Sequence, residues 1–318
     1  MNHSRVLGID VSKKRLDCAL FPQTPDGAFS PENCEAGAAA LIEYLQASEP
    51  AVVALEASGG CERLIVARLR EAGVTVLILQ PAAVRAFATL RGRKAKNDRL
   101  DAQLIAEFAA RFGEAREPRP AAWDRLAELL TYYEQVAEDA ARVRTCLASL
   151  HDPEIRDRAT ARLKGLAAEK TALLQRLRAL VAALPELAAR VKLLATMPGI
   201  GFLNAVNLAV RMPELGRLSN KAVAALAGLA PFDDDSGERA GQRSIRGGRG
   251  RVRRLLFMGA MSAIRVNPIV RALYARLIAR GRAHKSAVTA AMRKMIVTLN
   301  AMMRTHQPWS DITQPEQA

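Results

Sequence analysis

The chain has 318 residues and a formal net charge of +15, and half of its residues are hydrophobic although only 4% are aromatic. This composition favours helices over sheet sandwiches, and the length is sufficient for more than one domain. No apolar run is long enough to cross a membrane and there is no signal-peptide pattern, which argues against a membrane partner. The four cysteines are scattered without a C-x-x-C pair, which argues against a disulfide framework or a zinc site, so we expect a protein of the reducing cytoplasm.

The positive charge is concentrated toward the C-terminus. Residues 236–304 contain 16 Lys or Arg and one acid, Glu238, whereas the rest of the chain balances 31 basic against 31 acidic residues. A basic surface confined to one region is typical of proteins that bind nucleic acids. A solvated basic face is the simpler alternative, but solubility alone does not need so lopsided a ratio.

Residues 1–118 are predicted to form a first domain of alternating strands and helices. Apolar runs predict strands at 5–11, 15–21, 51–56 and 74–79, the first two as a hairpin. The spacing of apolar residues predicts helices at 38–45, 58–72 and 98–112. A hairpin followed by alternating helices and strands is a mixed α/β layer fold.

Four carboxylates fall at the ends of these elements. Asp10 and Glu56 stand at the ends of two strands, and Asp98 and Asp101 share one face of the last helix. Grouped carboxylates repel one another unless a cation lies between them, so they indicate a divalent metal that meets phosphate. Singly, each has a simpler explanation as a turn residue, a surface charge or an acid favoured at a helix N-terminus. The loop before the last helix adds four cations predicted to bind nucleic acid: Arg91, Arg93, Lys94 and Lys96.

The order of three motifs, G-I-D at 8–10, L-E-A-S-G at 55–59 and K-N-D-R-L-D-A at 96–102, resembles the DEDD-type transposases of insertion sequence family 110. The resemblance implies that the first domain has the RuvC-like RNase H fold. It also implies that four catalytic residues bind Mg²⁺, expected as two ions with Mn²⁺ as a substitute: Asp10, Glu56, Asp98 and Asp101. Cys61 departs from the family pattern, which often has an aromatic residue at this position.

Residues 119–190 are predicted to form a coiled-coil helical hairpin. Apolar residues recur every three or four positions from Trp123 to Leu184, interrupted by a short turn at Pro153. Such a hairpin serves dimerisation or acts as an intramolecular spacer, and the residues do not decide between these uses. Its near-neutral charge argues against its being the main nucleic-acid surface.

Residues 191–318 are predicted to form a mostly helical C-terminal domain. The P-G-I-G sequence at 198–201 resembles a helix-hairpin-helix turn, in which the backbone near Gly199 and Gly201 binds a phosphate. Any Gly/Pro loop between helices has a similar sequence. A short helix is expected at 221–229 and two more within 265–303, and the tail after Trp309 is expected to be disordered.

A polar, glycine-rich loop follows Phe232. By its residues alone Ser236 is an ordinary loop serine, and no histidine lies near it in sequence to activate it. The resemblance to the C-terminal domain of the same transposases implies that Ser236 is their nucleophile. Because arginine neutralises phosphate oxygens with two parallel hydrogen bonds, the loop and the helix after it supply further predicted nucleic-acid contacts: Arg239, Arg243, Arg246, Arg249, Arg251, Arg253 and Arg254.

The resemblance thus implies a DNA transposase or recombinase in which Ser236 attacks DNA phosphodiesters at a Mg²⁺ site. Its implied partners are double-stranded DNA, a bridge RNA that selects the DNA by base pairing, and further copies of the chain in a dimer or tetramer. Two alternatives stay open. One is a hydrolytic metal nuclease resembling junction resolvases, in which water attacks, and the other is a non-catalytic nucleic-acid scaffold.

Overall fold

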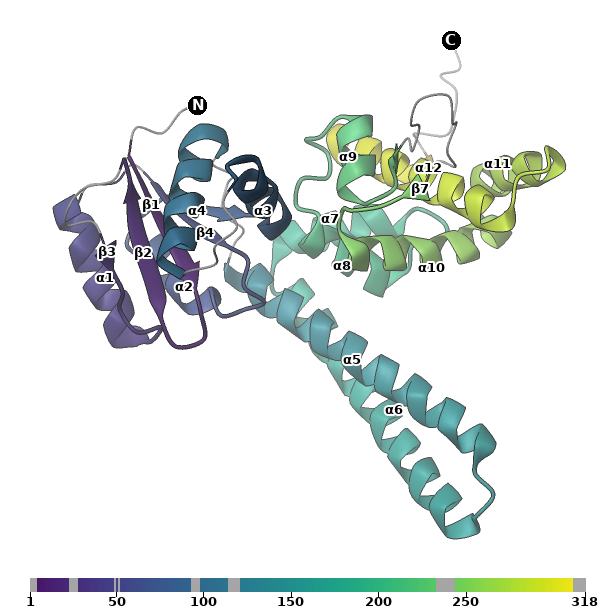
Figure 1. Cartoon of the computed structure of the whole chain (residues 1–318). Helices are drawn as coiled ribbons and strands as arrows, with labels where there is room; N and C mark the ends of the chain where they lie inside the picture. Colours follow the sequence, from purple (N-terminus) through teal and green to yellow (C-terminus); the bar gives the residue numbers. More distant parts are fainter. Residues whose placement is uncertain are drawn as a thin grey trace. The chain divides into compact units, whose positions relative to one another are not determined.

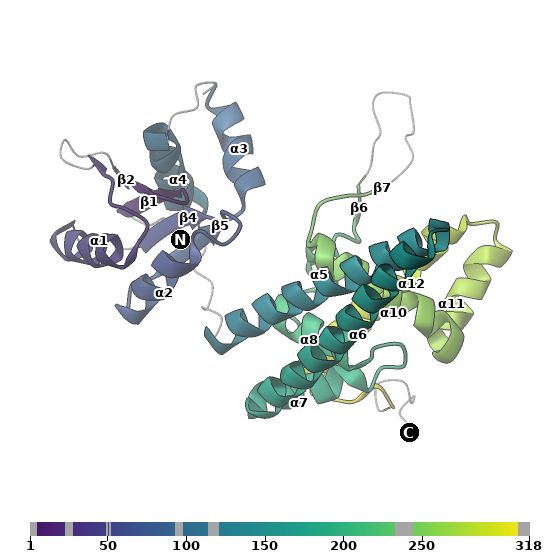
Figure 2. The same cartoon turned by 90° about the horizontal axis from the view of Figure 1, so that it is seen from below.

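Contacts in the computed structural model divide the chain into two compact units, Met1–Arg119 and Pro120–Ala318. The structure describes residues 5–22, 28–48, 50, 52–92, 98–113, 121–232 and 244–310, with the backbone alone for residues 28, 98–100, 121, 232 and 244. Figures 1 and 2 show the two units from different sides, and each unit is described by itself. The further division at residue 190 stays a prediction, and the tail predicted to be disordered lies almost wholly outside the described residues.

The first unit is built on a five-stranded mixed sheet. Its strands, in the spatial order β3-β2-β1-β4-β5, are β1 (Val6–Val11), β2 (Leu16–Phe21), β3 (Ala28–Phe29), β4 (Val52–Glu56) and β5 (Val76–Leu79). β2 is antiparallel to β1 and β3, whereas β4 is parallel to both β1 and β5. The predicted hairpin and the mixed α/β class are therefore confirmed, and the two-residue β3 is an addition to them.

Helices cover both faces of this sheet (Figure 1). They are α1 (Glu35–Ser48), α2 (Arg63–Glu71), α3 (Pro81–Leu90) and α4 (Asp98–Phe112). Successive strand residues point to opposite faces. Ile9 and Leu55 are buried in the cluster that includes α1 and α2, whereas Val6 and Ala54 are buried in the cluster that includes α3 and α4.

Two helices of the first unit differ from the sequence prediction. α2 begins at Arg63 rather than near residue 58, because Gly59 and Gly60, with φ of +75° and +117°, first turn the chain. α3 was not predicted at all. Pro81 starts it, where its fixed φ suits the first turn, and Val84 and Phe87 bury the helix against the core.

The second unit contains the predicted helical hairpin, formed by α5 (Ala121–Ser149) and α6 (Pro153–Ala182). Asp152 caps α6 by accepting a hydrogen bond of 3.0 Å from the backbone N–H of Ile155. Near the base of the hairpin, Leu130 of α5 and Leu177 of α6 are fully buried, whereas Ile155 near its tip is 51% exposed. The apolar seam is therefore closed at the base and open at the tip.

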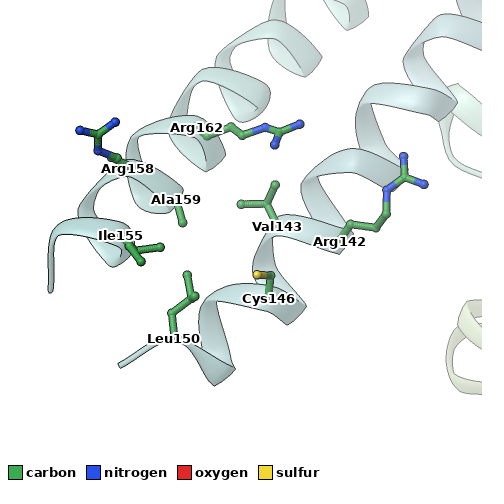
Figure 3. A pocket seen from close by; sticks show the side chains of 8 residues that line it. All are labelled: Arg142, Val143, Cys146, Leu150, Ile155, Arg158, Ala159 and Arg162. Carbon is green, nitrogen blue, oxygen red and sulfur yellow. The ribbon is translucent and has the colours of Figure 1, made fainter. Parts of the chain in front are cut away.

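A hollow of about 380 Å³ lies at this open tip (Figure 3). Its lining is aliphatic and basic with one thiol: Arg142, Val143, Cys146, Leu150, Ile155, Arg158, Ala159 and Arg162. Because the lining side chains include no carboxylate, this hollow is not the predicted metal site.

The rest of the second unit is a helical domain whose core also takes in the base of the hairpin, with Leu130 of α5 and Leu177 of α6 in the same buried cluster. Its elements are α7 (Pro185–Ala195), α8 (Phe202–Arg211), α9 (Asn220–Leu226), the ladder of β6 (Pro231–Phe232) and β7 (Ser244–Ile245), α10 (Gly250–Val266), α11 (Pro268–Ala279) and α12 (His284–Thr305). α12 contributes Met295, Ile296 and Leu299, all fully buried. In the described part of the chain no helix is by itself long and apolar enough to cross a membrane, and α10 and α11, bent by 94°, meet the length and composition test only as a pair.

Candidate active site

β1 and β4 place Asp10 and Glu56 side by side. The two strands are parallel and pair Ile9 with Leu55, so Asp10 and Glu56 are the next residues of the neighbouring strands. Ala54 lies two residues before Glu56 and is buried in the cluster with α4. Because side chains alternate along a strand, the two carboxylates face the α4 side of the sheet at its carboxyl end.

Gly8 allows α4 to lie directly on β1. A Cβ atom at this position would lie 2.2 Å from the carbonyl oxygen of Ala102 and 2.5 Å from the backbone nitrogen of Ala106. Gly8 precedes Asp10 by two residues on the same strand face, and Ala102 follows Asp101 directly. The contact therefore brings the first turns of α4, which carry Asp101, beside the end of β1.

Electrostatic interactions connect three of the predicted ligands. Burial and the negative charge of Asp10 raise the pKa of Glu56, Arg85 of α3 acts in the opposite direction, and Asp101 raises it further. Asp98 begins α4, but its side chain is not among those described. Among the described side chains, no three His, Cys, Asp or Glu residues form a group that could hold a metal ion.

Two polar residues that the sequence analysis missed hold the loops after β1 and β4. The side-chain amide of Asn33 donates hydrogen bonds to the carbonyl of Ser12 (2.9 Å) and to the carbonyl of Cys61 (3.0 Å), so it joins the two loops. Glu62 accepts hydrogen bonds from two backbone N–H groups and one hydroxyl of residues 58–60. Although burial acts to raise the pKa of Glu62, these hydrogen bonds to its charged form hold it below its ordinary value.

Arg91, a predicted nucleic-acid ligand, follows α3 and is held by internal contacts. Its guanidinium pairs with Glu107 of α4, a carboxylate that is 4% exposed, and lies 5.9 Å from the ring centre of Phe87. Arg111 reaches the same carboxylate at 2.9 Å. A role for Arg91 in nucleic-acid binding stays a prediction. The other cations predicted in this loop lie outside the described residues: Arg93, Lys94 and Lys96.

The loop with the predicted nucleophile is defined at its base. Three predicted site residues on it lie outside the described residues: Ser236, Arg239 and Arg243. The segments on either side pair as the β6–β7 ladder. Below the ladder, a Cβ atom on Gly248 would lie 2.3 Å from the backbone nitrogen of Gly228, so these backbones touch. Arg253 donates hydrogen bonds to the carbonyls of Gly247 (2.6 Å) and Gly228 (3.3 Å), which ties both ends of the loop together.

The other predicted arginines at the start of α10 make contacts within the second unit. Arg249 forms hydrogen bonds of 2.6 Å and 2.7 Å with the two carboxylate oxygens of Glu214. Arg251 and Arg254 pair with two acids of α5, Glu134 at 3.3 Å and Glu138 at 2.5 Å. The last two pairs attach α10 to α5, and at all three arginines a phosphate would compete with a carboxylate for the guanidinium group. Arg246 is exposed.

The P-G-I-G turn at 198–201 joins α7 to α8. Gly199 has a φ of +100°, and a Cβ atom there would lie 2.6 Å from the Cβ of Ala263 on α10. Close packing against α10 is therefore sufficient to explain this glycine. Gly201 precedes α8, is exposed, and has open space where a Cβ would stand, and a phosphate contact there stays a prediction.

Two family models match the chain. The first is a model of DEDD-type IS110 proteins that is described as transposase, and it matches residues 7–152. The second is described as transposase of the IS116/IS110/IS902 family, and it matches residues 191–275. Together the two models cover most of the sequence. The chain therefore belongs to the IS110 family of transposases, enzymes that act on DNA, as the sequence motifs predicted.

Individual relatives differ in how much of the chain they match. The pilin gene-inverting protein of Moraxella lacunata is 26% identical in an alignment of 312 positions that covers 95% of this chain and 97% of that protein. The insertion element IS110 uncharacterized 43.6 kDa protein of Streptomyces coelicolor is 31% identical in an alignment of 220 positions that covers 65% of this chain and 53% of that protein. Among solved structures, Thermus thermophilus RuvC in complex with a Holliday junction substrate covers 36% of this chain and 99% of its own, at 20% identity and a TM-score of 0.28.

Proposed function

We propose that the carboxylates of the first unit cleave and join DNA strands with bound Mg²⁺. The observation that carries this proposal is the position of Glu56, which is partly buried beside Asp10 at the carboxyl end of the sheet and also feels the negative charge of Asp101. Mutual repulsion disfavours the charged forms, and a divalent cation would relieve it. Because carboxylate oxygens are the ligands that Mg²⁺ prefers, the donor set fits this ion. Asp98 would complete the set, since it precedes Asp101 by three residues on α4.

The ion would supply electrostatic stabilisation for the phosphoryl group that is transferred. Ser236 would supply the nucleophile. Its Oγ forms a bond to the phosphorus of the scissile phosphodiester, the bond from phosphorus to the 3′ oxygen breaks, and the serine proton ends on that oxygen as a free 3′-hydroxyl. When the 3′-hydroxyl of a partner strand attacks the phosphoserine, the reverse transfer joins the strands and releases Ser236.

A second candidate function is hydrolysis by a metal nuclease. The carboxylates of the first unit are consistent with it, because in this reaction water attacks the phosphorus and Ser236, which belongs to the second unit, is not needed. The similarity to a pilin gene-inverting protein over nearly the whole chain supports recombination instead, since inversion requires strands to be rejoined. The two functions differ in whether a DNA end becomes attached to the protein.

The family resemblance leads us to propose two further partners. A bridge RNA would select the donor and target DNA by base pairing, which leaves the protein to hold nucleic-acid backbones. A second copy of the chain would complete a dimer, or further copies a tetramer. The open apolar seam at the tip of the α5–α6 hairpin, where Ile155 is half exposed, supports association of this kind.

Asp101→Asn tests both catalytic candidates against the non-catalytic scaffold. The substitution keeps the size of the side chain and removes its charge, so we expect Mg²⁺-dependent DNA cleavage to fall by about 10²–10³-fold. Asp157→Asn, the same change on the exposed surface of α6, is the control and should cleave like the wild type. If Asp101→Asn also cleaves like the wild type, the carboxylates are structural and both catalytic proposals fail.

A further inference from the structure

A strongly basic surface outside the candidate active site lies at the end of α11, the start of α12 and the turn between them. Residues 268–305 contain eight Lys or Arg and no Asp or Glu. Arg276 and Arg280, four positions apart, lie on the same side of α11, whereas Arg271, nine positions before Arg280, points the opposite way. Four exposed cations follow one another here, and we call them the α11–α12 basic face: Arg276, Arg280, Arg282 and Lys285.

Acids of the described residues do not neutralise the cations of this face. None of its four cations forms an ion pair within 4.0 Å with an acid in the part of the chain that the structure describes. The arginines at the start of α10 differ, because Arg249 and Arg254 already bind Glu214 and Glu138. Among the described residues, the α11–α12 basic face therefore keeps its charge available for a partner.

Most of the exposed side chains around the cations are small. On α11 they include three alanines, Ala272, Ala275 and Ala279, although Ile278, between Arg276 and Arg280, is 40% exposed. Between Lys285 and Arg293 on α12, the residues that reach the surface are small: Ser286, Thr289 and Ala290. A polymer backbone can approach such a surface closely while the long basic side chains reach out to it.

The face offers charge rather than a platform for stacking bases. The single Phe, Tyr or Trp in residues 268–305 is Tyr274. It is half-buried, and its hydroxyl forms a hydrogen bond of 2.8 Å with Nδ1 of His284. Proteins that bind single strands use aromatic side chains on which bases stack, whereas contacts from basic side chains alone fit the phosphates of a duplex.

The cations are also spaced for neighbouring phosphates. Arg276 and Arg280 are one helical turn apart, about 6 Å along the axis, and Arg282 and Lys285 follow across a turn in which Gly281 has a φ of +75°. Duplex DNA carries one charge per about 1.7 Å of its axis, so several of these side chains can meet phosphates at once. We propose that the α11–α12 basic face binds the phosphate backbone of double-stranded DNA. This inference rests on the proposed function only in taking DNA as the partner.

Binding of a labelled 30-base-pair DNA duplex to the full chain tests the proposal. Fluorescence anisotropy would be measured in EDTA over a series of salt concentrations, so that failure of catalysis does not affect the result. The test variant replaces Arg276, Arg280 and Arg282 by Gln. The control replaces three exposed arginines at the hairpin tip by Gln and removes the same charge: Arg142, Arg158 and Arg162. Two of these are already paired with acids of their own helices.

We expect the test variant to bind at least about tenfold more weakly at moderate salt, and its slope of log K against log salt to be shallower by about two to three. The control and a variant with Lys at the same three positions of the face should bind nearly like the wild type. Equal losses in the Gln variant and the control would show that total charge, not this face, sets affinity, and would overturn the proposal. Unchanged binding of the Gln variant, no binding by the wild type, or tighter binding of an RNA duplex of the same sequence would overturn it too.

Discussion

Substitution of Gly8 by Ala tests whether the contact of α4 with β1 builds the active site. The new Cβ would lie 2.2 Å from the carbonyl oxygen of Ala102 and 2.8 Å from the Cβ of Ala106, so the helix must move away by about 1 Å to reach ordinary contact. Overpacking of this kind costs about 1–3 kcal/mol, which corresponds to a Tm lower by about 4–12 °C in a unit of this size. Asp101 moves with the helix, and a misplacement of about 1 Å at a site of this type costs about 10²-fold in rate.

Two spectroscopic measurements show in which unit the stability falls, and a DNA-cleavage assay measures the loss of rate. Far-UV circular dichroism follows the unfolding of both units, whereas tryptophan fluorescence reports the second unit alone, because it contains both Trp123 and Trp309. Gly165→Ala is the matched control, since this glycine is exposed on α6 with open space at its Cβ position, and alanine there should add up to about 1 kcal/mol of stability. If Gly8→Ala keeps both the wild-type Tm of the first unit and full DNA cleavage, the inferred packing is refuted.

Three further predictions concern charged and polar contacts. Because the pKa of Glu56 is raised in the folded chain, its ionised form lowers the stability above that pKa, and this cost disappears as the pH falls through it. Glu56→Gln should therefore have a higher Tm than the wild type at neutral pH in EDTA and the same Tm near pH 4. Added Mg²⁺ should raise the Tm of the variant less than that of the wild type. Asn33→Asp should lower the free energy of unfolding of the first unit by about 1–3 kcal/mol in urea titrations, because both donated hydrogen bonds are lost; an unchanged midpoint would contradict the role given to this amide. Glu214→Gln should lower the free energy of unfolding of the second unit by about 1–3 kcal/mol in urea titrations followed by tryptophan fluorescence, since Arg249 loses its ionised partner. Arg158→Gln, which removes one member of a largely exposed ion pair, should change the urea midpoint little.

The parts of the fold that follow a regular hydrophobic period were accessible from the sequence. The strands that carry Asp10 and Glu56 and the long helices of the hairpin differ from their predicted bounds by a few residues. α3 was missed, although Pro81 and the apolar Val84 and Phe87 form a helix signal, because two apolar positions in a ten-residue helix make only a short hydrophobic period. The late start of α2 depends on the backbone of Gly59 and Gly60, which the period of apolar residues does not report.

The candidate site was predictable where it depends on strand ends and helix faces. Alternation along β1 and β4 is enough to put Asp10 and Glu56 on one face of the sheet. Asn33 was not predictable, since its two partners lie 21 and 28 residues away and belong to separate loops. The pairing of Arg249 with Glu214 was equally hidden, because contacts between distant helices decide which arginines keep a free charge.

A covalent-adduct assay tests the central claim most directly. Purified wild type, Ser236→Ala and Glu56→Gln would each be incubated with Mg²⁺, RNA from the flank of the mobile element, and end-labelled DNA that carries the joined element ends, and then separated on a denaturing gel. The proposed mechanism predicts a labelled protein–DNA band in the wild type that is lost in both variants. Cut DNA without any adduct, in the wild type and in Ser236→Ala alike, would show that the carboxylates direct hydrolysis and that Ser236 is not the nucleophile.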